Sequence, residues 1–359
     1  MREPKKRNSP TIRDVARHAG VSPMSVSNFL NGRLHLMRDD TRARIEVAIK
    51  HLGYRPSSQA RGFRQGKDYT VGMIVVDPSP NFLVEPFIGH VVTGLSTELS
   101  AQGYACLLQG VRNSRLDDAT LHTFARSDAL CLFPSGPAPQ RRRLIAKLAS
   151  FGIPLVLIED TVPSDIEDIV CVRQDDAGGA KMLMRHLLDL GARRFLYAAP
   201  EPVWPANVAR ETMFRRMVRK LGSKASFARL DCGFGNFAEV QEALERWLDA
   251  GGRCDAILAN NDHIGIAVLK ALDARGIAVP DDMMVTGFGA FELWNYSSPL
   301  LTTVASPAHA LGQCAARALL DRLARGSFAQ REWVLPMSFR SGETTRQHER
   351  QPGSRTAQQ

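Results

Sequence analysis

Apolar residues recur three and four positions apart in two short stretches of residues 11–31, a spacing that predicts two helices meeting at a tight turn. Thr11 suits the start of the first helix, where Asp14 can complete a capping box, and Gly20 suits its end, where a left-handed residue is favoured. The predicted buried faces are Ile12, Val15, Ala16 and Ala19 in the first helix and Val26, Phe29 and Leu30 in the second. The pattern predicts a helix-turn-helix, although a helical hairpin with a Gly turn has a similar pattern.

The second helix of this pair begins with Ser22 as its cap and Pro23 at its first position, where a missing N–H has no cost. Its apolar face leaves Pro23, Met24, Ser27 and Asn28 facing outward or close to the start of the helix. In a helix-turn-helix, this second helix enters the major groove of DNA.

Charge supports a DNA-binding head. Residues 1–67 hold 15 Lys and Arg against 5 Asp and Glu, a net of +10, while the whole chain carries +9. The other 292 residues therefore carry −1, because +9 minus +10 is −1. A basic excess confined to one small segment is the expected footprint of phosphate binding.

A third helix is predicted from about residue 40 to Leu52, followed by Gly53 as its cap and by an extended Tyr54-Arg55-Pro56 step. Residues 57–64 are long enough for two helical turns, but a helix of this length is marginal on its own, since about 12–15 residues are needed. Residues 65–68 read as a linker, where we place the domain boundary.

After residue 69, short β-branched stretches alternate with amphipathic helices. The predicted strands are 71–76, 105–109, 129–133, 155–158, 195–199, 256–259 and 284–288. The predicted helices include 88–102, 140–150, 178–190, 208–221, 237–250 and 262–275. Strands that are apolar throughout and alternate with helices predict α/β lobes with parallel sheets covered on both faces, and ligands in such folds bind at the carboxyl ends of the strands.

Composition narrows the class of protein further. The chain has 359 residues, 44% of them hydrophobic, and no apolar run near the roughly 18 residues that span a bilayer. Its basic N-terminus leads into a polar helix and does not resemble a secretory signal. The six cysteines lack a Cys-x-x-Cys spacing, so disulfides and zinc are not expected and a reducing cytoplasm fits best. The nine histidines show no paired metal spacing, and we expect neither a metal nor a cofactor.

Ten short motifs occur in an order that resembles the lactose-repressor (LacI/GalR) family of bacterial transcriptional regulators. They are TIRDVA (11–16), VS (21–22), LN (30–31), LGYRP (52–56), AR (60–61), DDAGG (175–179), ND (261–262), VPDD (279–282), GF (287–288) and PLLTTV (299–304). The resemblance implies a helix-turn-helix head at 1–56, a hinge helix and linker at 57–68 and a periplasmic-binding-protein-like core at 69–340. It places one lobe at about 69–162 and 292–325, the other at about 163–291 and 326–340, and we expect a disordered tail at 341–359.

The resemblance also implies a homodimer that binds a near-palindromic operator in double-stranded DNA and remains associated with the bacterial nucleoid. Hinge helices would form on DNA and open the minor groove, with Ala60 in the hinge and Phe63 as the wedge. Phosphate contacts are expected from Thr11, Ser22, Ser25, Ser27 and Asn31. Base contacts are expected from Pro23, Met24 and Asn28; Asn at position 28 favours adenine, where many relatives have Arg, although Met24 could equally be a partly buried filler.

In this family a small effector, here a sugar, polyol or sugar acid, binds between the two lobes. The corresponding positions are Glu85, Phe87, Ile88, Glu159, Arg210, Asp262 and Trp294. Trp294 could stack on a sugar or simply pack the hinge, and Arg210 could be a surface arginine. The family's Gly-Phe-Asp is Gly-Phe-Gly at 287–289 and its Asp-Arg is Glu-Asp at 159–160, so we expect an altered effector.

Three alternatives to a repressor remain open. An α/β enzyme is disfavoured because the chain lacks a Gly-x-Gly-x-x-Gly fingerprint, a Walker loop and a Gly-x-Ser-x-Gly elbow. A cytoplasmic sugar-binding protein without a DNA role would account for the core but not for the basic head. An activator of the same family shares every feature described above.

Overall fold

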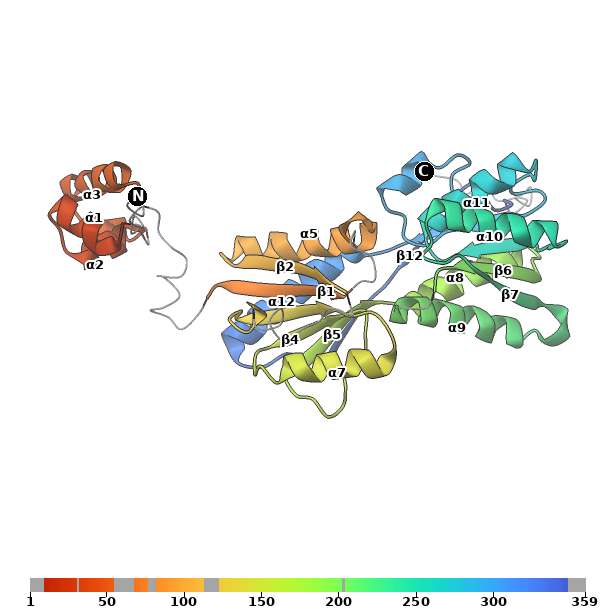
Figure 1. The fold of residues 1–359 in the computed structure, drawn as a ribbon, viewed down its shortest axis with the longest axis horizontal. Coiled ribbons are helices and arrows are strands. Elements are labelled where there is room, and N and C mark those ends of the chain that lie inside the picture. Colours follow the sequence, from red (N-terminus) through yellow and green to blue (C-terminus); the bar gives the residue numbers. More distant parts are fainter. Residues whose placement is uncertain are drawn as a thin grey trace, which may run out of the picture. The chain divides into compact units, whose positions relative to one another are not determined.

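The computed structural model describes residues 10–30, 32–54, 68–76, 82–112, 123–201 and 204–347. Contacts within the chain divide it into two compact units, Met1–Tyr69 and Thr70–Gln359. Asn31 and the predicted hinge residues Ala60 and Phe63 lie outside the described residues. The two units are considered separately below (Figure 1).

The first unit is helical and has a small core of its own. It contains α1 (Ile12–Ala19), α2 (Pro23–Leu30), the 3₁₀ turn η1 (Leu34–Leu36) and α3 (Asp39–Leu52). The predicted capping box is present: the Thr11 N–H donates to Asp14 Oδ2 (2.9 Å) and the Asp14 N–H donates to Thr11 Oγ1 (3.3 Å). Gly20 and Gly53 end α1 and α3 in the left-handed region. The apolar faces pack together through the buried residues Val15, Ala16, Ala19, Val26, Ile45, Ala48 and Tyr54.

The first lobe of the second unit is a six-stranded parallel sheet in the order β11-β5-β4-β3-β1-β2. The strands are β1 (Thr70–Val76), β2 (Ala105–Val111), β3 (Ala129–Phe133), β4 (Leu155–Ile158), β5 (Ile169–Gln174) and β11 (Glu332–Leu335). Helices α5 (Pro86–Ala101) and α12 (Ala308–Arg325) cover one face, and α7 (Ala138–Ala149) covers the other. The short turn η2 (Phe82–Val84) precedes α5.

Helices α5 and α12 approach each other through two glycines. A Cβ at Gly94 would lie 2.0 Å from the His309 carbonyl oxygen, and a Cβ at Gly312 would lie 2.0 Å from the Val91 carbonyl oxygen. Since no larger residue fits at either position, this close packing depends on glycine.

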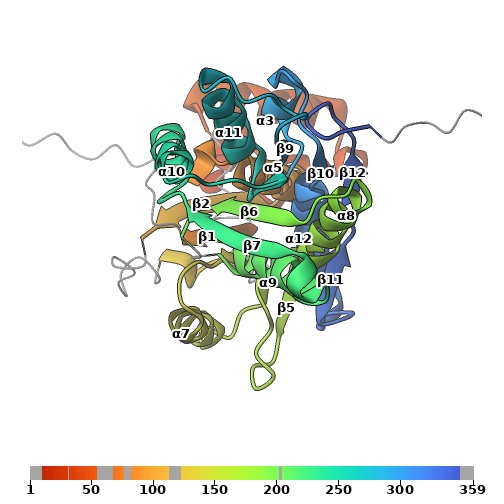
Figure 2. The ribbon, with the colours of Figure 1, turned by 90° about the vertical axis from the view of Figure 1, so that its right-hand side faces the viewer.

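The second lobe is a four-stranded parallel sheet in the order β7-β6-β8-β9. Its strands are β6 (Arg194–Ala199), β7 (Ser226–Asp231), β8 (Ala256–Ala259) and β9 (Met284–Thr286). Helices α10 (Phe237–Asp249) and α11 (Asp262–Ala274) cover one face, whereas α8 (Asp176–Asp189) and α9 (Pro205–Arg219) cover the other (Figure 2). The turns η4 (Gly222–Lys224) and η5 (Glu292–Tyr296) complete this lobe.

Three chain crossings connect the lobes. The first runs from β5 to α8, the second from β9 through β10 (Thr303–Ala305) to α12, and the third from β11 to β12 (Ser338–Arg340). Strands β10 and β12 pair antiparallel, and the Asp175 N–H donates to the Leu335 carbonyl (2.9 Å). The three crossings are therefore hydrogen-bonded to one another.

The predicted fold class, a helical head followed by an α/β core with two parallel-sheet lobes, is confirmed. The predicted lobe boundaries are wrong at β5 and β11, which belong to the first lobe's sheet, and at η5, which packs on the core of the second lobe. Strand β5 continues the parallel pairing of β4, and its residues 169–172 are buried. The second lobe consequently begins at α8.

The predicted disorder from residue 341 is also corrected. Thr344 is fully buried; its hydroxyl donates to the Val285 carbonyl (2.6 Å) and accepts from the Thr302 N–H (2.8 Å). These bonds hold the segment 341–347 against the second lobe, while residues 348–359 lie outside the described residues. Across the described ranges, no helix combines the length and apolarity needed to span a bilayer.

Candidate functional site

Two of the predicted base-reading residues, Pro23 and Met24, lie at the exposed start of α2, and Asn28 lies further along the helix. Val26 is fully buried, whereas Met24 is 65% exposed, which rules out the filler role for Met24. Pro23 is exposed and Asn28 is half-buried. The side chain of Ser22 caps the helix by accepting from the Ser25 N–H (3.1 Å). The helix therefore presents an apolar pair at its N-terminus and an amide at Asn28.

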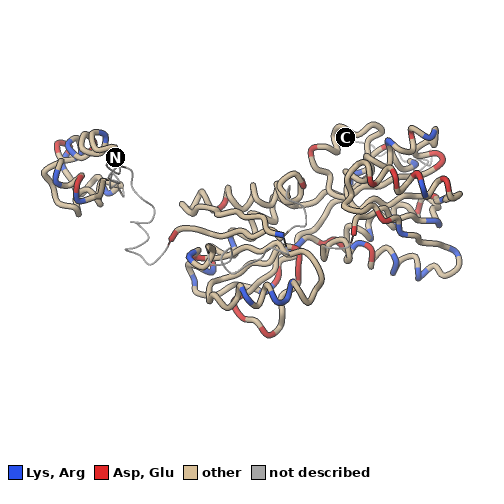
Figure 3. Tube along the Cα trace, in the orientation of Figure 1, with Lys and Arg blue, Asp and Glu red and all other residues tan. Residues whose placement is uncertain are grey.

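The predicted phosphate-binding hydroxyls flank this surface. The Thr11 hydroxyl donates to Asp14 Oδ2 (2.7 Å), and the Ser22 and Ser25 hydroxyls lie 3.0 Å apart. Ser27 lies further along α2. Lys and Arg residues occur along the helices of this unit (Figure 3). Phosphate binding by these four hydroxyls remains a prediction.

A pocket lies where the start of α5, from the first lobe, meets the start of α11 and the turn η5. It contains three of the predicted effector residues, Glu85, Asp262 and Trp294. Its other lining residues, which the sequence did not single out for the effector, are Pro86, Asn261, His263, Phe288, Phe291 and Leu293.

Asp262 is held by the protein itself. The Thr303 hydroxyl donates to its Oδ1 (2.7 Å) and the Ala290 N–H donates to its Oδ2. Burial raises the pKa of this carboxyl, and the hydrogen bonds from Thr303 and Ala290 partly offset that rise. Asp262 therefore fixes the loop after β9 in addition to lining the pocket.

Trp294 has the packing role, one of the two roles left open by the sequence, and stacking on a sugar remains a prediction. Its indole N–H donates to the Leu301 carbonyl (2.6 Å), which anchors η5 to the crossing that leads to β10. The ring also lines the pocket. A ligand there would meet the indole ring, while its polar N–H is already bonded.

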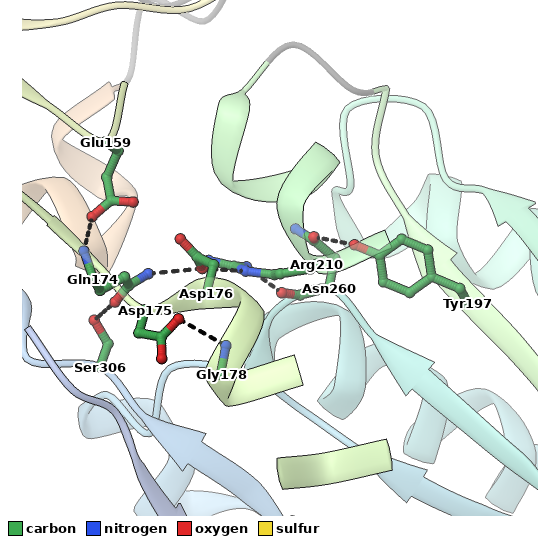
Figure 4. Close-up of polar contacts among 9 residues, drawn as sticks. All are labelled: Glu159, Gln174, Asp175, Asp176, Gly178, Tyr197, Arg210, Asn260 and Ser306. Atoms are coloured by element: carbon green, nitrogen blue, oxygen red, sulfur yellow. Dashed lines mark hydrogen bonds and ion pairs between the residues drawn. The ribbon is translucent and has the colours of Figure 1, made fainter. Parts of the chain in front are cut away.

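Arg210 and Glu159 belong to a separate buried polar network at the junction of the lobes (Figure 4). The Arg210 Nε donates to Asp176 Oδ1 (2.7 Å) and its Nη1 donates to the Asn260 carbonyl (2.6 Å). Its guanidinium carbon lies 3.8 Å from the centroid of the Phe288 ring. The side chain is only 10% exposed, so a surface role for this arginine is excluded.

Gln174 links this ion pair to the first lobe. Its N–H donates to Glu159 Oε1 (2.7 Å), and its Nε2 donates to Asp176 Oδ1 (3.1 Å). The Ser306 hydroxyl donates to Gln174 Oε1 (2.6 Å), which adds the second crossing to the network. Five of the predicted effector residues thus lie in two groups. Glu85, Asp262 and Trp294 line the pocket, and Glu159 and Arg210 belong to the polar network at the junction of the lobes.

Burial is the main cause that raises the pKa of Glu159 well above its ordinary value of 4.5, and the negative charge of Asp176 raises it further. The Gln174 N–H and the Arg210 charge act in the opposite direction. Glu159 also adopts a left-handed backbone (φ 56°), a conformation that is uncommon outside glycine.

We expect Glu159→Gln to change how stability depends on pH. A folded-state pKa above the unfolded value means that the free energy of unfolding falls as pH rises from about 4.5 through the folded pKa. Gln keeps an acceptor for the Gln174 N–H but does not titrate, so the variant should gain stability relative to the parent as pH rises. Urea denaturation between pH 5 and 8 measures this; parallel curves for the two proteins would show that Glu159 does not titrate there.

Aromatic rings close the junction on both sides of this network. Phe133 at the end of β3 stacks on Trp204 at the start of α9 (4.7 Å between centroids), and Phe87 lies 5.7 Å from Phe133. His90 of α5 stacks on Phe291 (5.0 Å). Phe87 is thus close to the second lobe, as predicted for a cleft residue.

The predicted effector contact at Ile88 is wrong. Ile88 is 1% exposed, and together with Val91, Leu95 and Leu99 it forms the face of α5 that packs on the sheet. The spacing of these residues on a helix places Ile88 toward the core, one position away from Phe87.

Most of the residues that the sequence missed follow parallel strands at their carboxyl ends, where ligand sites of such sheets occur. Gln174 is the last residue of β5, Asp176 lies just after that strand, and Asn260 follows β8. The DDAGG and ND motifs contain or directly follow these residues, so the motifs could have indicated a polar site here. Trp204 and Phe291 carried no comparable signal.

The fold and these two groups define a class: a basic helix-turn-helix unit on the same chain as a two-lobed α/β receptor with a pocket between its lobes. Residues 11–57 match the model of bacterial regulatory proteins of the lacI family, and residues 184–345 match that of the periplasmic binding protein-like domain. The chain belongs to the LacI/GalR family of bacterial transcriptional regulators.

Relatives support this over nearly the full length. The transcriptional regulator CelR of Thermobifida fusca is 28% identical over 331 residues, which cover 89% of this chain and 93% of CelR. The ribose operon repressor of Escherichia coli is 26% identical over 329 residues, covering 90% of this chain and 96% of the repressor. The structure of a lac repressor dimer bound to operator superposes with a TM-score of 0.80 at 20% identity, covering 94% of this chain and 99% of that one. A CelR–cellobiose complex gives 0.67 at 26% identity, covering 93% and 99%.

Proposed function

We propose that this protein is a repressor that binds a near-palindromic operator as a homodimer in the bacterial cytoplasm, and that a sugar-like effector bound between its lobes controls operator affinity. The observation that carries the proposal is the exposed start of α2 on a basic head, joined in one chain to a pocket that both lobes line. Relatives named for cellobiose and ribose support a sugar as the effector.

The dimer brings two copies of α2 to two half-sites. A helix-turn-helix dimer reads half-sites about one helical turn apart, so operator symmetry follows from protein symmetry. The hinge at 57–68, with Ala60 and Phe63, is proposed to fold against the minor groove between the half-sites. A lac repressor dimer bound to its operator has the same fold.

A direct experiment combines selection of operator sequences with an effector screen. Full-length protein is used to select sites from random DNA, and the selected operator is then titrated with protein in the presence of ribose, glucose or cellobiose. The proposal expects a near-palindromic site whose affinity changes with at least one sugar. A loss of affinity indicates a repressor released by its effector, and a gain indicates an effector-dependent binder. Selected sites without symmetry would overturn the dimeric mode.

Asn28 is expected to determine one base pair in each half-site. Asn→Ala at this position should weaken binding to the selected operator by about 1–3 kcal/mol and relax the preference at that base pair, because a bidentate amide–adenine contact is lost. Fluorescence anisotropy on the operator and on its single-base variants measures both effects.

The matched control for Asn28→Ala is Arg33→Ala, an exposed residue just after α2. If Arg33 contacts phosphate, its removal weakens binding to all sequences alike and leaves the base preference intact. An unchanged base preference in Asn28→Ala would show that Asn28 does not read a base.

A further inference from the structure

Two arginines of the core, Arg210 and Arg141, are already engaged by carboxylates. Arg210 is paired with Asp176, as described above, and its side chain is 10% exposed. Arg141, at the start of α7, donates from Nε to Asp160 Oδ2 (2.8 Å) and from Nη2 to Asp160 Oδ1 (3.3 Å). Its Nη1 donates to the Gly136 carbonyl (2.6 Å). An anionic ligand would have to compete with a buried carboxylate for either cation.

Carboxyl groups outnumber these cations. Glu159 lies beside Asp176 and Asp160 and is 4% exposed, and Asp262 is 6% exposed. Glu85 adds a carboxylate to the pocket from the end of the first lobe's η2–α5 segment. The burial that raises the pKa of Glu159 and of Asp262 disfavours a buried negative charge in general, so a ligand carboxylate or phosphate would meet the same cost here.

The described lining of the pocket is also acidic. Of the described residues that line it, two are acidic, Glu85 and Asp262, and none is Lys or Arg. Phe288, Phe291 and Trp294 supply aromatic rings. Aromatic faces attract the apolar faces of rings and also cations, whereas they offer nothing to an anion.

We propose that the cleft selects against anions, and that the effector is a neutral or amine-bearing hydroxylated ring. Carboxylates accept hydrogen bonds from ring hydroxyls or an amino group, and the aromatic rings cover the apolar face of the ring. Sugar acids and sugar phosphates bind less tightly, because Arg210 and Arg141 are already paired with Asp176 and Asp160. The inference rests on the proposed function, since it concerns the ligand of the same cleft.

A charge series on one ring tests the inference in full-length protein. Thermal shift is measured with ribose, glucose and cellobiose, with glucosamine, and with the anions glucuronate, gluconate and glucose 6-phosphate, because a ligand that binds only the folded state raises Tm. Neutral or amine-bearing members should bind at least about tenfold more tightly than their anionic counterparts. Tightest binding by an anion would overturn the inference while leaving a sugar-type effector in place. A panel without any shift would contradict the proposed effector class itself, and the inference with it.

A variant provides a second arm of the test. Glu85→Gln removes one negative charge from the pocket at a half-buried position, so it should fold as the parent does. It should narrow the discrimination between glucose and glucuronate by about fivefold, the effect of one unit charge near contact in a watery cleft. Glu242→Gln on α10, with a side chain 72% exposed, is the matched control and should leave the ratio unchanged. An unchanged ratio in Glu85→Gln would show that the charge of the pocket does not set the selectivity.

Discussion

Replacing Arg210 with Ala is expected to lower the free energy of unfolding of the core by about 3–5 kcal/mol, because it leaves the carboxylate of Asp176 buried without its cation. Asp176 has a side chain only 5% exposed, and it would keep the bond from the Gln174 amide but no cation. The loss of the contact between the guanidinium and the Phe288 ring adds to the effect. Urea denaturation of the full chain, monitored by far-UV circular dichroism, measures the change.

Arg216→Ala is a suitable control, because Arg216 lies on the same helix but is exposed. Its substitution should change stability by less than about 0.5 kcal/mol. A change equally small for Arg210→Ala would show that the Asp176 pair is not needed for folding. Arg210 has a structural role in this network, so loss of effector response in Arg210→Ala does not by itself demonstrate ligand contact; effector assays therefore need stability measured in parallel.

Operator affinity is expected to fall by about 10³-fold between 50 and 200 mM salt. A loss of this size is typical of proteins that neutralise six or more phosphates. The physical reason is counterion release by the head, whose residues 1–67 carry the entire basic excess of the chain. Anisotropy titrations on the selected operator across this range give the slope of log K against log salt.

Charge variants locate the origin of the slope. Removing one phosphate-binding cation from the head should reduce the slope by about one, so Arg13→Gln and Arg33→Gln are informative substitutions. Arg219→Gln at the end of α9 is the control, because it changes the same charge in the core. A slope near zero, or an equal reduction in the core variant, would contradict phosphate binding by the head.

The elements that sequence predicted well are those whose signals are local. The capping box at Thr11, the left-handed Gly20 and the buried strand 129–133 each depend on a few neighbouring residues, and all three lie where they were predicted. Strands β5 and β11 were not predicted, because pairing with a distant strand determines their place in the sheet. Because this long-range pairing was not predicted, the predicted lobe boundary was misplaced.

The candidate site was less predictable for a related reason. Resemblance located Arg210 and Asp262 at the junction, but it could not show that Asp176, Asn260, Thr303 and Ala290 already bind their polar atoms. Those partners come from four separate segments, and only the folded chain brings them together. At Ile88 the resemblance predicted a ligand contact for a residue that lies in the core. Ile88 directly follows Phe87, which lies near the cleft, but its side chain points to the other face of the helix.

The stack of Trp204 on Phe133 allows the contact between the lobes to be monitored by tryptophan fluorescence. One ring comes from each lobe and their centroids lie 4.7 Å apart, so any rotation of the lobes must separate them. The emission of an indole responds to what lies against its face, and Trp204 is therefore a native fluorophore at the contact between the lobes. Comparing the parent with Trp204→Phe separates its signal from those of the other three tryptophans.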